Sequence, residues 1–145
     1  MFQAARDVDG FNSGWVQQSV WRVPPPVAAL LDVVSMTPAR NSGSGYPIRF
    51  TFRNLAGADQ IVSTSVPVNG YLDGYRGCYL GYHVENIQCR IKALQSGAEI
   101  NGTDLTLTLM IEFKVGFTGD RVFYVSAQDG ITTSGWQVMA SWTVP

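Results

Sequence analysis

Hydrophobic and polar residues alternate along two long stretches of the chain. Tyr46–Asn54 places its apolar residues on one face and Arg49, Thr51 and Arg53 on the other. Thr103–Lys114 follows the same rule, with Leu, Ile and Phe at every second position. A period of two is typical of a strand that buries one face. Both stretches are therefore predicted to be half-buried β-strands.

Shorter β-rich runs separated by turn residues fill most of the remaining chain. Asn101-Gly102 is a strong tight-turn signal, Asn41–Gly45 is expected to be a turn, and Pro67 indicates an edge strand or a bulge. Only 27–34, which contains Ala-Ala-Leu-Leu, offers a helical alternative. About eight short strands with frequent turns predict an all-β fold, an antiparallel β-sandwich. The further strands are expected at Leu30–Thr37, Gln60–Asn69, Cys78–His83, Ile87–Lys92, Arg121–Ala127 and Trp136–Val144.

The last predicted strand carries apolar residues at every second position, including two tryptophans. This alternation places them on one face and favours burial in the sandwich core over an exposed platform for stacking sugars. The residues expected to share this face are Trp136, Val138, Ala140, Trp142 and Val144.

The two ends of the chain carry one pattern twice. Met1–Pro24 and Val122–Pro145 align without a gap at an offset of 121 residues, and all four tryptophans align in pairs. The chain is therefore predicted to be the tail of one repeat followed by one whole repeat. The seven identical pairs are Phe2/Phe123, Ser13/Ser134, Gly14/Gly135, Trp15/Trp136, Trp21/Trp142, Val23/Val144 and Pro24/Pro145.

Three consecutive prolines, Pro24–Pro26, separate the tail copy from the whole repeat. Proline donates no N–H and stiffens the backbone, so we expect the boundary there. The predicted organisation is a tail hairpin at 1–24, a proline-rich linker at 25–29 and the sandwich at 30–145. The tail is an apolar strand pair without its own domain, and we expect it to contact a partner. Its candidate partner-binding residues are Phe2, Trp15, Val20, Trp21 and Val23.

Composition narrows the classes of function. Hydrophobic residues make up 46% of the chain and charged residues 14%, with a net charge of −1 and no basic cluster. A nucleic-acid surface that tracks phosphates is therefore not expected. No apolar run approaches the roughly 20 residues of a spanning helix, so no membrane insertion is expected. The start of the chain has no signal-peptide pattern, so if the parent protein is secreted or attached to the cell surface, we expect this chain to be a piece of it.

The two cysteines, Cys78 and Cys89, flank a predicted hairpin that turns near His83-Val84. Neighbouring strands hold Cα atoms about 4.5–5.5 Å apart, which a disulfide tolerates. A disulfide is the preferred interpretation, and two buried free thiols are the alternative. A metal site is not expected, because two cysteines and one histidine do not supply four tetrahedral ligands. A disulfide would place the protein outside a reducing cytoplasm.

No catalytic signature stands out. His83, the single histidine, has no nucleophile motif around it, and the eleven carboxylates are scattered through turns. Asp7–Asn12 resembles the start of a calcium loop but lacks a ligand at Phe11 and the required glycine at Asn12. Asn101-Gly102-Thr103 matches a glycosylation acceptor, although a hairpin turn explains it as well. We expect no enzyme activity, no cofactor and no metal.

Tyrosine and glycine are interleaved in Gly70–Gly81 and just beyond it. Exposed tyrosines form amphipathic contact surfaces, and glycines let the backbone turn tightly. The segment is a candidate ligand-binding face for a glycan or a surface protein, or a loop whose tyrosines cover the sandwich edge. The candidate residues are Tyr71, Tyr75, Tyr79 and Tyr82.

The ending SGW-x5-W-x-VP resembles the immunoglobulin-like tandem modules of large bacterial extracellular and cell-surface proteins. The resemblance covers nearly the whole chain and implies an immunoglobulin-like sandwich with a structural or adhesive role; it transfers no catalytic residue. Its other matching segments are Val33–Pro38, Ser42–Gly45, Phe50–Phe52, Cys78-Tyr79, Cys89 and Thr106–Leu109.

Three hypotheses about function follow. The first is a non-enzymatic repeat of a secreted or surface-attached protein, whose N-terminal segment contacts neighbouring repeats. The second is a filament or assembly subunit in which 1–24 joins identical subunits by strand exchange. The third is a carbohydrate-binding module that uses the tyrosine-rich segment.

Overall fold

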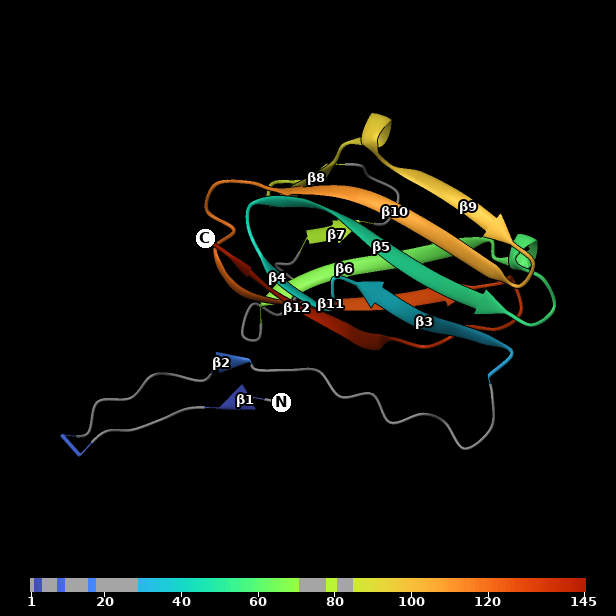
Figure 1. The fold of residues 1–145 in the computed structure, drawn as a ribbon, viewed down its shortest axis with the longest axis horizontal. Coiled ribbons are helices and arrows are strands. Elements are labelled where there is room, and N and C mark those ends of the chain that lie inside the picture. Colours follow the sequence, from blue (N-terminus) through green and yellow to red (C-terminus); the bar gives the residue numbers. More distant parts are fainter. Residues whose placement is uncertain (1, 4–7, 10–15, 18–28, 71–77, 81–84) are drawn as a thin grey trace.

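A computed structural model describes residues 2–3, 8–9, 16–17, 29–70, 78–80 and 85–145 of the chain. These residues form two five-stranded β-sheets and a separate pair of two-residue strands. The sheets pack face to face in Figure 1, and the described part contains no α-helix. The predicted all-β sandwich is confirmed.

The first sheet contains the two strands with the clearest alternation. Its strand order is β3-β5-β10-β8, and β9 lies beside β10 next to β8. The 3-10 turn η2 (Ala93–Gln95) separates β8 from β9. The bounds are β3 (Leu31–Thr37), β5 (Gly45–Asn54), β8 (Cys89–Ile91), β9 (Gly97–Asn101) and β10 (Asp104–Phe113).

The second sheet has the order β4-β12-β11-β6-β7. All of its pairings are antiparallel except that of β4 with β12, which is parallel. The 3-10 turn η1 (Ala58–Gln60) precedes β6. The bounds are β4 (Arg40–Ser42), β6 (Ser63–Gly70), β7 (Cys78–Leu80), β11 (Gly119–Gln128) and β12 (Gln137–Val144).

This arrangement is immunoglobulin-like. The strands β3, β5, β10 and β8 take the order of strands A, B, E and D in immunoglobulin domains. The neighbours β12, β11 and β6 take the order of G, F and C. The short strands β4 and β7 extend this second sheet at its two edges.

The alternation read from β5 and β10 is the pattern that fills the core. In β5, Ile48, Phe50 and Phe52 are fully buried, whereas Arg49 and Arg53 are exposed. The residues of β10 that pair with this buried face are also apolar. Both half-buried strands were predicted correctly, because burial on one face of a strand repeats every two residues.

Aromatic rings from both sheets meet at the centre. The ring of Phe123 in β11 lies 6.3 Å from that of Phe50, 6.5 Å from that of Phe113 and 6.2 Å from that of Trp142. Tilted and edge-on ring contacts at such distances stabilise a fold by about 0.5–1.5 kcal/mol per pair, in addition to the hydrophobic effect of burying the ring surfaces. This cluster holds the two sheets face to face.

The prediction that Trp136 and Val138 share the buried face of the last strand is wrong. Trp142 is 1% exposed and Ala140 is buried, but Trp136 is 57% exposed and Val138 is 39% exposed. The register between β11 and β12 shifts at this point, from Phe123 paired with Ala140 to Tyr124 paired with Val138. An extra residue at a bulge moves the following side chains to the other face of the sheet.

Pro67 does not mark an edge strand, because β6 lies between β11 and β7. Residues 63–65 and 68–70 of β6 pair with β11, whereas Val66 and Pro67 do not. The register is the same on both sides of this interruption. Proline has no N–H to donate to a ladder. Pro67 therefore coincides with a local interruption of the ladder, rather than with a bulge.

Two local expectations for the first third of the domain differ from the structure. Residues Arg40–Ser42, expected within or beside a turn, form β4, which pairs with a strand about one hundred positions later in the chain. A strand partner so distant in the sequence leaves no signal in the local residue pattern. Leu31–Thr37 forms the expected strand, and the helical alternative for 27–34 is wrong where it overlaps β3.

Candidate functional site

The N-terminal copy of the repeated segment contains a strand pair in the structure. Phe2–Gln3 forms β1 and Val16–Gln17 forms β2, and the two are antiparallel. At the offset of 121 residues their counterparts are Phe123–Tyr124 and Gln137–Val138. These counterparts lie in β11 and β12, which also pair with each other. In both copies, therefore, the corresponding segments of the chain form two antiparallel strands that pair with each other.

The two hairpins differ in register and in what surrounds them. Gln3 pairs with Val16, whereas its counterpart Tyr124 pairs with Val138 beside the bulge. The β11–β12 pair lies inside a five-stranded sheet, but β1 and β2 form a sheet of their own. In the part of the chain that the structure describes, no strand extends the outer edges of this hairpin.

Most of the residues predicted to bind a partner or a ligand lie outside the described residues. This holds for Trp15, Val20, Trp21 and Val23 in the tail, and also for Tyr71, Tyr75 and Tyr82 in the tyrosine-rich segment. Phe2 and Tyr79 are described in their backbones only, in β1 and β7. Tyr79 pairs with Pro67. The candidate calcium segment is described only at Val8 and Asp9, and His83 is not described.

The two cysteines do not belong to one hairpin, contrary to the expectation. Cys78 begins β7, which pairs with β6 in the second sheet, whereas Cys89 begins β8, which pairs with β10 in the first sheet. Cys89 is fully buried in the core cluster and is disulfide-bonded. The side chain of Cys78 lies outside the described residues, so the pairing of the two stays a prediction. Such a bond would connect the two sheets.

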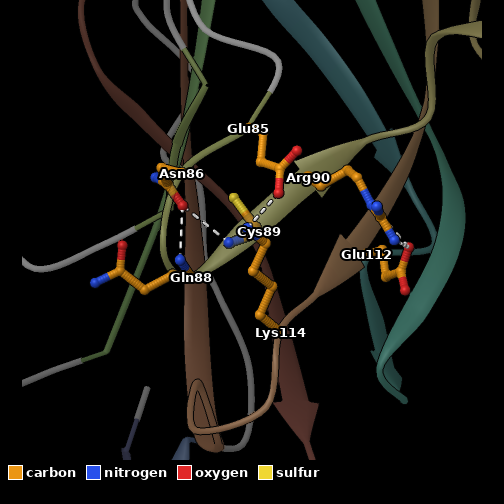
Figure 2. Close-up of polar contacts among 7 residues, drawn as sticks. All are labelled: Glu85, Asn86, Gln88, Cys89, Arg90, Glu112 and Lys114. Carbon is orange, nitrogen blue, oxygen red and sulfur yellow. Dashed lines mark hydrogen bonds and ion pairs between the residues drawn. The ribbon is translucent and has the colours of Figure 1, made fainter.

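Polar contacts hold the backbone around Cys89 in place (Figure 2). The Asn86 side-chain oxygen accepts hydrogen bonds from the backbone N–H of Gln88 at 2.8 Å and of Cys89 at 2.9 Å. An asparagine that bonds backbone groups two and three residues ahead stabilises a turn. The turn before β8 is thereby fixed.

Ion pairs connect this segment to β10. Glu112 accepts hydrogen bonds from Arg90 and lies 3.1 Å from the Lys92 nitrogen, and Glu85 pairs with Lys114. Hydrogen bonds from Arg90 and Lys92 hold the pKa of Glu112 below its usual value, and Lys114 does the same for Glu85. These groups are exposed, and exposed pairs contribute little to stability. The cluster orients β8 against the end of β10.

A second polar cluster joins two loops at one end of the sandwich. Asn54 is fully buried, and its side-chain nitrogen donates to Asp129 Oδ2 at 3.2 Å. Asp129 Oδ1 accepts hydrogen bonds from the backbone N–H of Ile131 at 3.1 Å and of Thr132 at 2.7 Å. The bonds from Thr132 and Ile131 hold the pKa of Asp129 below its usual value. The carboxylate therefore fixes the β11–β12 loop against the end of β5.

That same end of the sandwich, called the entry pole here, comprises residues 29–30, 55–62, 101–103 and 129–136. Backbone N–H groups connect its parts: that of Leu55 donates to Leu30 at 2.8 Å and that of Ala58 to Gly102 at 3.1 Å. In Figure 1 the start of β3, the ends of β5 and β9, and η1 all lie at the right. The strand pattern did not predict this grouping, because loops far apart in sequence form it.

The entry pole carries many exposed apolar side chains. Six of the twelve large apolar residues that are exposed among the described side chains lie on it or in β9 just before it. Trp136, which directly precedes β12, is among them. The six are Leu30, Leu55, Val62, Ile100, Ile131 and Trp136.

No group of three or more His, Cys, Asp and Glu side chains among the described residues is placed to hold a metal ion. None of the helical segments in that part of the chain has the length and hydrophobicity to cross a bilayer.

No protein-family model matches the chain, and no curated protein matches it significantly.

Proposed function

We propose that the chain is a non-enzymatic, immunoglobulin-like repeat module of a secreted or surface-attached protein, acting as a spacer or adhesive unit. The observation that carries the proposal is the strand pairing of the N-terminal copy. Residues 2–3 pair with residues 16–17, and their counterparts 121 positions later lie in two strands that also pair, although in a different register. A hairpin that repeats the last two strands of the sandwich is what the end of a preceding module would contribute.

A disulfide between Cys78 and Cys89 fits this role. Cys89 is buried and disulfide-bonded, and the strands of the two cysteines belong to opposite sheets. Disulfides persist outside the reducing cytoplasm. We therefore place the module outside the cell or on its surface.

Deleting residues 1–24 tests the proposal. The truncated protein should fold with an unchanged melting temperature, because β1 and β2 contribute no strand to either five-stranded sheet. Light scattering should give a monomer for both the full chain and the truncated protein. Loss of folding after truncation would contradict the assignment of residues 1–24 to a preceding module.

The second candidate function is an assembly subunit that polymerises by strand exchange. The hairpin β1–β2 forms a sheet of its own, and open strand edges can pair with another chain. This candidate predicts oligomers of the full chain that disappear when residues 1–24 are deleted. Oligomers that persist after the deletion would contradict it, and a monomeric full chain would favour the spacer.

A further inference from the structure

The entry pole is the place where the sandwich receives the chain from residues 1–24. Leu30 precedes β3, and its carbonyl oxygen accepts the hydrogen bond from Leu55 that joins the incoming chain to the β5–β6 loop. Only six residues, 25–30, separate Pro24 from β3. Six residues span about 20 Å at full extension. Anything that ends at Pro24 therefore stays close to the entry pole.

The composition of the entry pole suits an interface. Its loops contain no Lys or Arg, and Asp59 and Asp129 are its only charged residues. The Asp129 carboxylate already accepts hydrogen bonds from its own loop and from Asn54. Ile131 is 97% exposed and Trp136 is 57% exposed. Apolar and aromatic residues with few charges are typical of the buried centre of an interface, since covering them desolvates little charge.

The opposite end of the sandwich, called the exit pole here, carries a smaller apolar surface. It comprises residues 43–46, 114–119 and 143–145, and hydrogen bonds from Phe113 to Ser44 and from Gly43 to Thr143 connect its parts. Tyr46 and Val115 are its exposed apolar side chains. In Figure 1 the C-terminus lies at this end, away from the start of β3. In a chain of identical modules, each exit pole would face the next entry pole.

We propose that the entry pole docks the exit pole of the preceding module, so that neighbouring modules form one rigid unit. This inference rests on the proposed function, because it requires a preceding module that ends at residue 24. The short linker keeps the two poles close together, which raises their effective concentration for each other. A modest apolar contact is sufficient at that concentration, and Ile131 and Trp136 supply it.

A tandem protein tests the inference directly. Residues 1–145 are followed by a second copy of residues 25–145, which reproduces the Pro24–Pro25 junction because Pro145 is the counterpart of Pro24. The test variant carries Ile131→Ser and Trp136→Ser in the second module. The matched control carries Ile87→Ser and Leu94→Ser there, since both residues are highly exposed and lie outside the two poles. The same variants in the single chain establish that folding is preserved.

The measurement is the rotational correlation time of each module from ¹⁵N relaxation. Docked modules tumble together, so the tandem protein and its control should give the long correlation time of one body. The Ile131→Ser/Trp136→Ser variant should fall towards the value of the single chain. A stiff proline linker alone could also couple the modules, but the test variant would not release that coupling.

The outcomes separate the two proposals. Two folded modules that tumble independently would overturn docking at the entry pole and leave the module proposal standing. The same holds if the test and control variants change the correlation times equally. Joint tumbling that the test variant leaves unchanged would overturn docking as well. A second copy that fails to fold in the tandem protein would instead contradict the proposed module.

Discussion

Trp142 and Trp136 belong to one repeated motif but lie in different environments. Trp142 packs against Phe113 and Phe123, and its indole N–H donates to the Gly43 carbonyl at 2.7 Å. This bond connects β12 to the turn after β4. Trp136, on the other side of the bulge, is exposed at the entry pole.

We predict that Trp142→Ala lowers the free energy of unfolding by about 3–5 kcal/mol, the usual cost of removing a buried tryptophan. Chemical denaturation measures this change. The matched variant is Trp21→Ala, at the counterpart position in the first copy. It should leave stability unchanged if residues 1–24 belong to a preceding module. A large loss for Trp21→Ala would show that the tail packs on this sandwich.

Asp129 should make stability depend on pH in the acid range. Hydrogen bonds from Thr132 and Ile131 lower its pKa in the folded protein below the ordinary value of 3.8. A lowered pKa stabilises the fold above the ordinary value, and this contribution is lost as the pH falls through the folded value. Protonation of the wild-type carboxyl therefore removes the advantage of its charge.

We predict that Asp129→Asn lowers the melting temperature at neutral pH, and that the difference from wild type shrinks below about pH 4. The variant loses the negative charge. In the wild type the Asn54 side-chain nitrogen donates a hydrogen bond to Asp129, and in the variant the new amide nitrogen can point at this donor. Thermal unfolding from pH 7 to pH 2.5 measures the effect. A difference that stays constant over this range would contradict the ionic contribution.

Among the elements, the β9–β10 hairpin isolates the effect of backbone conformation. Asn101 pairs with Asp104, so Gly102 and Thr103 form a two-residue turn. Gly102 has a φ of +59°, and a Cβ there would meet no atom within 4 Å. Gly97, at the start of β9, also has open space but no positive φ. The two glycines differ in conformation rather than in packing.

We predict that Gly102→Ala lowers the free energy of unfolding by about 1–2 kcal/mol, because a side chain disfavours left-handed backbone. Gly97→Ala is the control and should change it by no more than about 0.5 kcal/mol. Denaturant titration of both variants measures the difference. Equal effects would mean that the turn relaxes to accept a side chain.

The elements also show how far local sequence determines this fold. The long strands β5 and β10 were predicted closely, since they pair with each other over most of their length and carry apolar residues that face the core at every second position. The turn at Gly102 was predicted because it depends on adjacent residues. The bulge in β12 was missed, as was the assignment of β7 and β8 to different sheets. These features depend on partner strands that the local pattern does not specify.

For the molecule as a whole, the similarity between the two ends of the chain was visible in the sequence, but the entry pole that we propose as a docking surface was not. The aligned tryptophans predicted a tail and a module. The entry pole appears only after folding, because its exposed residues come from four separate segments and share no period. The tail and the tyrosine-rich segment remain candidates from sequence, since nearly all of their side chains lie outside the described residues.

If Cys78 and Cys89 form the proposed disulfide, their strands join β6 of one sheet to β10 of the other through a covalent bond. Closing so short a loop constrains the unfolded chain and stabilises the fold by about 2–3 kcal/mol. The aromatic cluster at the centre does not depend on this bond.

We therefore predict that Cys78→Ala/Cys89→Ala still folds, with a free energy of unfolding lower by about 2–3 kcal/mol. Denaturant titration measures the loss, and mass spectrometry of the unreduced wild-type protein after thiol alkylation should find no free thiol. Reducing agent should destabilise the wild type and leave the double variant unchanged, because only the wild type has a bond to reduce. Two alkylated thiols in protein purified without reductant would contradict the disulfide and remove the main support for an extracellular location.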